Sequence, residues 1–442
     1  MSRKMKDSGV DWIGTIPAEW EIKRLKSVLI ERNEKNAPIK TDFILSLTND
    51  RGVIPYTEKG DVGNKSKEDL TGYKLAYPND IVLNSMNVMI GSVGLSRYFG
   101  AVSPVYYMLY PRKTEDSVNY FNHIFQTKVF QESLKGYGNG ILEIRMRIQM
   151  SKLNTVMLPY PSSKEQEKIT NFLDENISKI DSIIELNKKS IEEYKQYKQS
   201  LISETVTKGI NAKVKLKDSG IEYLGDIPEN WTVKKLRYLG TLQNGISKSS
   251  EYFGQGYPFV SYGDVYKNIV LPQKVEGLVN SSISDRKSYS VKSGDVFFTR
   301  TSETIEEVGF ASTCLETIEN AVFAGFVIRF RPYSDELNPN FYKYYFRSQI
   351  HRKFFVKEMN LVTRASLSQE LLKKLPVLVP SIHEQKEIAN FLDAKCAHIN
   401  QLINQKEQLI NELETYKKSL LYECVTGKID VRNYKSSLEV RS

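Results

Sequence analysis

Two stretches of the chain carry apolar residues at alternating spacings of four and three. In the first stretch the series is Leu173, Ile177, Ile180, Ile184, Asn187, Ile191, Tyr194, Lys198 and Leu201. In the second stretch it is Leu392, Cys396, Ile399, Ile403, Lys406, Ile410, Leu413, Lys417 and Leu420. This heptad spacing is typical of a helix that packs along one seam against another helix.

Both stretches are free of helix-breaking residues, since residues 162–208 and 381–426 contain no Pro or Gly. Each begins with a capping signal, in which Ser162 or Ser381 stands three residues before Glu165 or Glu384. About 40 helical residues span roughly 60 Å. Because the other helix faces are polar, each seam requires a partner, and the obvious partner is the other stretch. The matched polar seam positions, Asn187 with Lys406 and Lys198 with Lys417, can fix the register.

These stretches belong to a larger internal duplication. Residues 161–210 and 380–429 match without gaps at an offset of 219, and both contain the pattern EQxxIxxFLD. A shorter repeat, DSGxxxxGxIPxxW, begins at Asp7 and again at Asp218, at an offset of 211. The middles, roughly 27–160 and 238–379, differ. A duplicated scaffold with divergent middles indicates one task performed on two different targets.

The two middles read as mixtures of strands and helices. Predicted strands are 43–47, 80–83, 106–110, 259–261, 295–299 and 326–330, and predicted helices are 118–134 and 339–357. The strings PNDIVLNS and SGDVFFTR align Asp80 with Asp295, so we expect one fold with two different surfaces. The predicted fold class is α/β (α+β): two globular domains, two long paired helices and a pseudo-two-fold tandem repeat. The predicted divisions are 1–160, 161–210, 211–379, 380–430 and a tail at 431–442.

Composition narrows the class of protein. A chain of 442 residues with 40% hydrophobic and 26% charged residues suits two to four folded domains. The net charge of +9 is mild, but it favours an anionic partner. The three cysteines are widely spaced, which indicates a reducing compartment. With no signal peptide and no apolar run of about 18 residues, we expect a cytoplasmic protein.

Polar and basic residues follow the predicted strands of both middles. Arg suits guanine, Asn or Gln suits adenine, Ser or Thr suits either, and Lys and Tyr suit phosphates. As isolated residues they would be ordinary solvated side chains, so the prediction concerns the groups. The first group is Asn84, Ser85, Asn87, Arg97, Tyr98, Arg145, Arg147, Gln149 and Lys152. The second group is Ser247, Lys248, Arg300, Thr301, Ser302, Arg364, Ser366, Ser368 and Gln369.

Signatures of catalysis are missing from the sequence. It contains no GxxxxGK[ST] phosphate loop, no NPPF-like methyltransferase motif, and no GxSxG or HExxH. The four histidines are scattered, which gives no spacing for a metal centre. We therefore expect neither a catalytic site nor a metal site.

The doubled DSGxxxxGxIPxxW and EQxxIxxFLD motifs, in this order, resemble those of the specificity subunits of Type I restriction-modification systems. The resemblance covers nearly the whole chain. It implies that two target-recognition domains each read one half of a bipartite DNA site. It also implies that the two long paired helices are antiparallel and set the spacing. It also implies a non-catalytic subunit without cofactors of its own. Its partners would be two modification subunits that use S-adenosylmethionine and restriction subunits that use ATP and Mg²⁺.

Two other interpretations remain open. A coiled-coil adaptor that binds proteins instead of DNA would have the same helices, but it would not need divergent middles with grouped Arg, Asn and Gln. A fused restriction-modification enzyme could contain a similar region, although the absent methyltransferase and nuclease motifs count against it.

Overall fold

The computed structural model describes residues 3–49, 51–60, 68–87, 91–139, 147–302, 308–358 and 365–435. The chain divides into two compact units. The first unit comprises Met1–Lys188 and Glu407–Ser442, and the second comprises Lys189–Lys406. Each unit therefore contains one copy of the short motif, one middle segment and a part of both heptad stretches.

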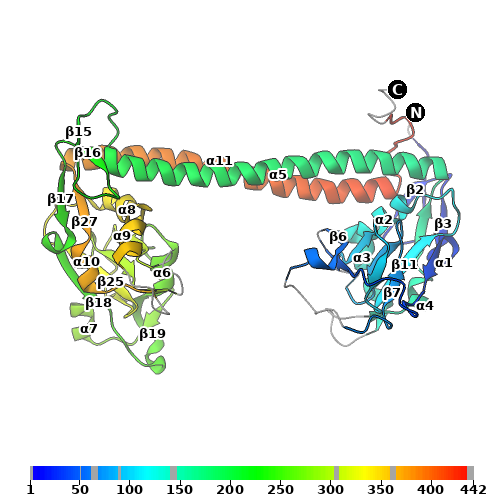
Figure 1. The fold of residues 1–442 in the computed structure, drawn as a ribbon, viewed down its shortest axis with the longest axis horizontal. Coiled ribbons are helices and arrows are strands. Elements are labelled where there is room, and N and C mark those ends of the chain that lie inside the picture. The colour runs from blue at the N-terminus through cyan, green and yellow to red at the C-terminus, as the bar shows by residue number, and fades with distance from the viewer. Residues whose placement is uncertain are drawn as a thin grey trace. The chain divides into compact units, whose positions relative to one another are not determined.

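The heptad stretches form two long helices, which confirms the prediction. Helix α5 spans Ser163–Lys208 and helix α11 spans Ile382–Val425 (Figure 1). The predicted capping box is present in α11, where Glu384 accepts hydrogen bonds from the backbone and hydroxyl of Ser381. In α5 the equivalent Glu165 has a different role, because it binds Trp20 and Arg3.

The two helices pack antiparallel within each unit. In the first unit Lys417 on α11 forms an ion pair with Asp181 on α5 at 2.6 Å. In the second unit Lys198 on α5 donates to Asn400 on α11 at 2.8 Å. In the first unit the hydroxyl of Tyr120 also donates to Pro159, just before α5 begins, and to Val425, where α11 ends. The seam is therefore formed by the predicted residues, and Leu173, Ile180, Leu392 and Ile399 are buried.

A four-stranded antiparallel sheet organises each middle segment. In the first unit the order is β4 (Leu29–Arg32), β11 (Tyr106–Pro111), β8 (Ile81–Asn84) and β9 (Val93–Leu95). In the second unit it is β18 (Gly240–Asn244), β25 (Val327–Pro332), β21 (Val296–Thr299) and β23 (Ala311–Thr313). The identical strand order confirms that the divergent middles share one fold.

The predicted helices 118–134 and 339–357 are each broken in two, so that part of the prediction was wrong. The first becomes α2 (Val118–Gln126) and α3 (Lys128–Ser133), and the second becomes α8 (Pro339–Arg347) and α9 (Ile350–Glu358). Thr127 and Ser348 adopt extended backbone at the breaks. Their hydroxyls donate to the preceding helical turn, to the carbonyls of His123 and Tyr345. The backbone N–H of each residue donates to the carbonyl three residues earlier, of Ile124 or Tyr345, so the first helix of each pair ends in a tight turn.

The predicted strands overlap observed strands in every case. The remaining strands are β1 (Met5–Asp7), β2 (Thr15–Pro17), β3 (Glu21–Arg24), β5 (Leu45–Thr48), β6 (Gly52–Pro55), β7 (Lys74–Ala76), β10 (Gly100–Val102), β12 (Gly138–Asn139), β13 (Arg147–Ile148), β14 (Met157–Tyr160), β15 (Leu216–Asp218), β16 (Asp226–Pro228), β17 (Thr232–Lys235), β19 (Phe253–Val260), β20 (Leu278–Val279), β22 (Thr301–Ser302), β24 (Val322–Phe323), β26 (Ala365–Ser366) and β27 (Pro376–Val379). The remaining helices are α1 (Leu25–Val28), α4 (Met150–Leu153), α6 (Tyr262–Lys267), α7 (Ile283–Ser288) and α10 (Gln369–Lys374), with short 3-10 turns at Tyr56–Glu58, Leu134–Tyr137, Leu236–Tyr238 and Ser250–Tyr252.

A tryptophan lies at the centre of each core. In the first unit Trp20 packs with Leu173 at the start of α5 and Val425 at the end of α11. In the second unit Trp231 packs with Leu392 on α11 and Val206 on α5. Each short motif therefore closes onto the beginning of one long helix and the end of the other. Among the described residues, no helix combines the length and hydrophobicity needed to cross a membrane.

Candidate nucleic-acid interface

The first group of predicted residues gathers in part where β8 ends. The backbone of Ile148, on β13, donates to the carbonyl of Ser85 at 2.9 Å, so the turn after β8 lies beside β13. Asn84 and Asn87 in this turn are half-buried. Ser85 is fully buried and donates to the carbonyl of Val105, which gives it a structural role.

Exposed basic and amide side chains flank this turn. Arg147 and Gln149 stand on either side of the buried Ile148, and Lys152 follows on α4; all three are exposed. The hydroxyl of Tyr107, on the central strand β11, donates to the carbonyl of Ile148 and holds β13 in place. We name Asn84, Asn87, Arg147, Gln149 and Lys152 the first edge.

Arg97 and Tyr98 lie elsewhere. The preceding residue Ser96 exchanges backbone hydrogen bonds with Asn79 and Asp80, immediately before β8 begins. Arg97 and Tyr98 are therefore separated from Asn84 by the length of β8, and the structure does not bring them together with the first edge. Tyr98 instead contacts Phe43 edge to face at 6.0 Å. Arg145 lies outside the described residues.

The second group gathers at the equivalent place, after β21. Leu367 donates to the carbonyl of Arg300 at 2.7 Å, and β22 pairs with β26 through Thr301 and Ser366. Gln369 donates to Asn244, at the end of β18. Ser247 lies near Arg300. A Cβ added at Gly325 would be 2.6 Å from the Ser247 hydroxyl oxygen, and the next residue, Phe326, accepts a backbone hydrogen bond from Arg300. We name Asn244, Ser247, Arg300 and Gln369 the second edge.

Several members of the second group have limited freedom. Lys248 forms an ion pair with Asp285 at 2.8 Å, and this contact holds the pKa of Asp285 at about 2. Ser368 caps α10 by accepting from the backbone of Leu371. Only the backbone is described for Thr301, Ser302 and Ser366, and Arg364 lies outside the described residues.

Sequence reasoning overlooked Phe326. Its carbonyl accepts from the backbone of Arg300 at 2.9 Å, so it lies at the second edge, and 64% of its surface is exposed. At the equivalent place in the first unit, Val105 accepts from the backbone of Ser85. The prediction treated Phe326 only as the first residue of a strand. The signal was the contrast between a large aromatic ring and valine at matched strand ends, because an exposed aromatic ring can contact a thymine methyl group or stack on a base.

An ion pair between a buried aspartate and a partly exposed arginine anchors each sheet, at the end of the central strand opposite to the edge. Asp80 and Asp295 are each 1% exposed. Asp80 pairs with Arg32 on β4 at 2.9 Å, whereas Asp295 pairs with Arg331 on β25 at 2.6 Å. Burial raises the pKa of Asp80 in spite of the nearby guanidinium. The aspartate is thus common to both units, while the arginine comes from a different strand in each.

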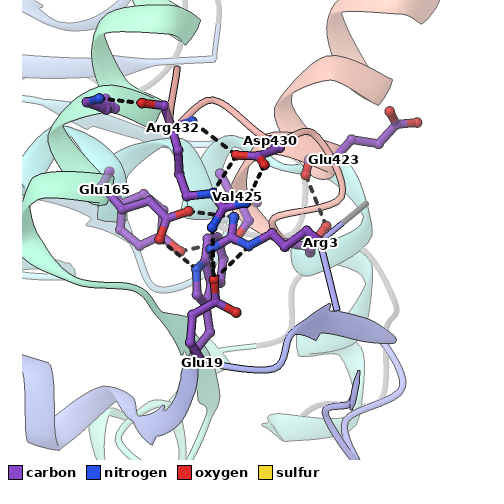
Figure 2. A network of polar contacts seen from close by, with 11 residues as sticks. Arg3, Glu19, Glu165, Glu423, Val425, Asp430 and Arg432 are labelled. Carbon is purple, nitrogen blue, oxygen red and sulfur yellow. Dashed lines mark hydrogen bonds and ion pairs between the residues drawn. The ribbon is translucent and has the colours of Figure 1, made fainter. Parts of the chain in front are cut away.

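The two tryptophans form matched joints with the long helices. In the first joint Trp20 donates to Glu165 at 2.9 Å, and in the second joint Trp231 donates to Glu384 at 3.2 Å. Figure 2 shows the first joint, where Arg3 lies between Glu165 at 2.6 Å and Glu19 at 2.8 Å. Arg432, paired with Asp430, reaches Glu19 from beyond α11. In the second joint Asn230 replaces Glu19 and donates to Glu384.

Within the described ranges, no group of three or more His, Cys, Asp or Glu residues is arranged to hold a metal ion. The polar residues at the two edges are amides, hydroxyls, lysines and arginines. Such groups can form hydrogen bonds with base edges and phosphates.

Comparison with known proteins identifies the family. The family model for the type I restriction modification DNA specificity domain matches residues 17–196 and 228–414. The type I restriction enzyme MjaVIII specificity subunit of Methanocaldococcus jannaschii is 24% identical and covers 95% of this chain and 95% of its own length. The EcoKI specificity subunit of Escherichia coli K12 is 24% identical over 80% of this chain and 75% of its own length.

Two solved structures share the fold. A chain from a type I restriction-modification system, solved to explain its complex assembly and conformational transition, gives a TM-score of 0.73 at 13% identity, covering 94% of this chain and 99% of its own. The HsdS subunit of Thermoanaerobacter tengcongensis gives 0.57 at 13% identity, covering 94% and 98%. The chain belongs to the type I restriction-modification DNA specificity family, as a non-catalytic DNA-recognition subunit with two target-recognition domains.

Proposed function

We propose that each recognition domain reads one half of a bipartite DNA target through its edge. The observation that carries this proposal is the equivalent position of the two edges on sheets of identical strand order, combined with their different side chains. One fold with two sets of amides, hydroxyls and guanidinium groups suits two different base sequences. Residues 27–160 and 238–379 are the exchangeable parts in this proposal, and the predicted boundaries at 160, 210, 379 and 430 separate them from the helices.

The partners follow from the same proposal. The two repeats provide equivalent surfaces on the long helices and around the two joints, and such repetition allows two identical modification subunits to bind one chain. Those subunits would use S-adenosylmethionine, and restriction subunits would use ATP and Mg²⁺, while this chain would supply no cofactor. We further propose that the complex acts in the cytoplasm.

The test is methylome sequencing of cells that carry this chain with its modification subunit. We expect one motif made of two half-sites with a fixed gap. Exchanging residues 27–160 for those of a relative should change only one half-site. A change in both half-sites would contradict the division of labour between the domains.

The roles of single residues can be separated by DNA-binding measurements. Arg147→Ala removes an exposed guanidinium from the first edge, and we expect a loss of about 1–3 kcal/mol together with relaxed specificity at one base pair, if the contact is to a base. Loss of a phosphate contact would instead weaken binding to all DNA sequences equally. It would also reduce the slope of the logarithm of the binding constant against the logarithm of salt concentration by about 0.9. Arg112→Ala is a control outside both edges, because Arg112 donates to the carbonyl of Lys26. An adaptor that binds only proteins would show no salt-dependent DNA binding at all.

A further inference from the structure

Two glutamines of the repeated EQxxIxxFLD motif connect the recognition domains to the long helices. Gln166 on α5 and Gln385 on α11 occupy equivalent positions, and both are 0% exposed. The side-chain oxygen of Gln166 accepts from the backbone of Ser117 at 2.9 Å, and that of Gln385 accepts from the backbone of Asn338 at 2.8 Å. Each buried amide therefore reaches from a long helix to the loop that begins a domain helix.

Both amides also use their nitrogen atoms in the same way. Gln166 donates to the carbonyl of Pro161, before its own helix, and to Asp116 in the domain. Gln385 donates to the equivalent Pro380 and to the carbonyl of Glu336. The two donors and the acceptor of each amide are satisfied, which is what a buried polar group requires.

The glutamine oxygen supplies something that the domain helices lack. Ser117 caps α2 and Asn338 caps α8. In a capping box, a Glu or Gln three residues after the cap accepts from the cap's own backbone N–H. Here those positions hold Tyr120 and Phe341, which cannot do so. The glutamine of the long helix takes the place of that Glu or Gln. The cap of each domain helix is therefore completed by a side chain from another helix.

A second contact fixes the direction of the domain helix. Asp174 on α5 meets His123 on α2 at 2.9 Å, and the equivalent Asp393 on α11 accepts from Tyr344 on α8 at 2.6 Å. These aspartates stand eight residues after the glutamines, which places both on one helix face. The glutamine and aspartate contacts hold α2 or α8 at the start of the helix and in its last turn.

We propose that Gln166 and Gln385 are positioning residues for DNA recognition, which fix the orientation of each recognition domain on its long helix. The proposal rests on the bipartite function given above. Neither glutamine belongs to an edge, so the half-site sequences do not depend on them. The gap that is allowed between the half-sites does depend on the glutamines. A domain that is free to tilt can reach its half-site at a gap other than the native one.

The experiment uses the full chain assembled with its modification subunits. Methylation rates are measured on duplexes that contain the native half-sites at the native gap and at gaps one base pair shorter or longer. For Gln166→Ala we expect unchanged half-sites, while the preference for the native gap falls about tenfold, equivalent to about 1.4 kcal/mol. Glu167→Ala, an exposed neighbour on the same helix, is the matched control and should retain the preference.

The second copy provides an independent repeat, with Gln385→Ala and its exposed neighbour Lys386→Ala. If Gln166→Ala fails to fold, as judged by thermal unfolding, Asp174→Ala replaces it, because 53% of the Asp174 side chain is exposed; we then expect a twofold to threefold loss of preference. Folded variants that keep the full preference for the native gap would overturn the proposal. A native complex that methylates no bipartite site would instead overturn the proposed function itself.

Discussion

The two joints use one apolar scaffold with different charges. Trp20 and Trp231 are both buried, and each donates to the first-turn glutamate of a long helix. Around Trp20 the glutamate is neutralised by Arg3, which also binds Glu19. At the positions equivalent to Arg3 and Glu19, the second copy has Val214 and Asn230.

The two joints differ in their polar partners, whereas the buried tryptophan and the glutamate that accepts from it are present in both. Where the buried arginine is present, a second carboxylate accompanies it; where valine replaces the arginine, an amide replaces that carboxylate. Hydrogen bonds from Ser381, Asn230 and Trp231 outweigh the effect of burial and hold the pKa of Glu384 below its ordinary value. Each copy thus satisfies its glutamate by its own route, because an unpaired buried charge is costly.

The largest expected effect comes from the glycines that end the long helices. Gly427 has a φ of +71°, and a Cβ there would lie 2.5 Å from Pro17 and 2.9 Å from Trp20. Gly209 has a φ of +74°, but its nearest contact is Trp231 at 3.5 Å. We expect Gly427→Ala to cost about 3 kcal/mol of unfolding free energy, from overpacking and strain, and Gly209→Ala about 1 kcal/mol, from strain alone.

Thermal and denaturant unfolding of both glycine variants would measure this difference. Gly294→Ala is a control for backbone strain without overpacking, since φ there is +88° and nothing lies within 4 Å of the added Cβ. Equal losses at Gly427 and Gly209 would mean that contact with the short motif contributes nothing at the first joint.

Neutralising the two glutamates is the next test. Glu165→Gln leaves Arg3, whose side chain is 6% exposed, with only Glu19, and we expect a loss of about 2 kcal/mol. Glu384→Gln keeps an acceptor for Trp231 and strands no cation, so about 1 kcal/mol is expected. Arg3→Val copies the second joint, and the double variant with Glu165→Gln should lose less than the sum of the single losses. Additive losses in denaturant melts would argue against coupling between Arg3 and Glu165.

The sequence was sufficient to predict the two long helices, the duplication and the shared fold of the two domains, because heptad spacing and gapless repeats can be read directly from the sequence. It was not sufficient for the helix breaks at Thr127 and Ser348, because serine and threonine also occur inside the unbroken helices α5 and α11. The two edges could not be predicted without knowing which strands lie side by side. Ser85 and Ile148 are far apart in sequence, and a backbone hydrogen bond joins the turn after β8 to β13. Arg97 was grouped with Asn84 because both follow a strand, but β8 and β9 are antiparallel, so the two residues lie at opposite ends of the strand pair.

Acid should affect the first joint through Asp430. A hydrogen bond from Arg432 holds the pKa of Asp430 at about 2, below its value of about 3.9 in an unfolded chain. The stabilisation is therefore complete above pH 4 and is lost as the pH falls from about 4 to 2. The pair is partly exposed, so we expect less than about 1 kcal/mol. Asn211 stands at the equivalent position in the second copy and does not titrate.

Denaturant midpoints at pH 5 and pH 3 would test this prediction in the native chain and in Asp430→Asn. The variant should lose less stability between the two pH values than the native chain does. The same drop in both proteins would assign the acid response to other carboxylates, such as Glu19, whose pKa is also lowered.

The smallest expected effect concerns the seam. Lys417 and Lys198 are equivalent residues, and so are their partners Asp181 and Asn400, yet the first unit has an ion pair and the second has a neutral hydrogen bond. Because these side chains are partly exposed, we expect Asp181→Asn to cost about 0.5 kcal/mol and Asn400→Asp to add a similar amount. Both differences should shrink in 1 M salt, because the side chains are partly exposed and salt screens such charges. If Asn400→Asp leaves the melting temperature unchanged at low salt while Asp181→Asn lowers it, the two contacts differ in geometry as well as in charge, and the seam is less symmetric than its sequence.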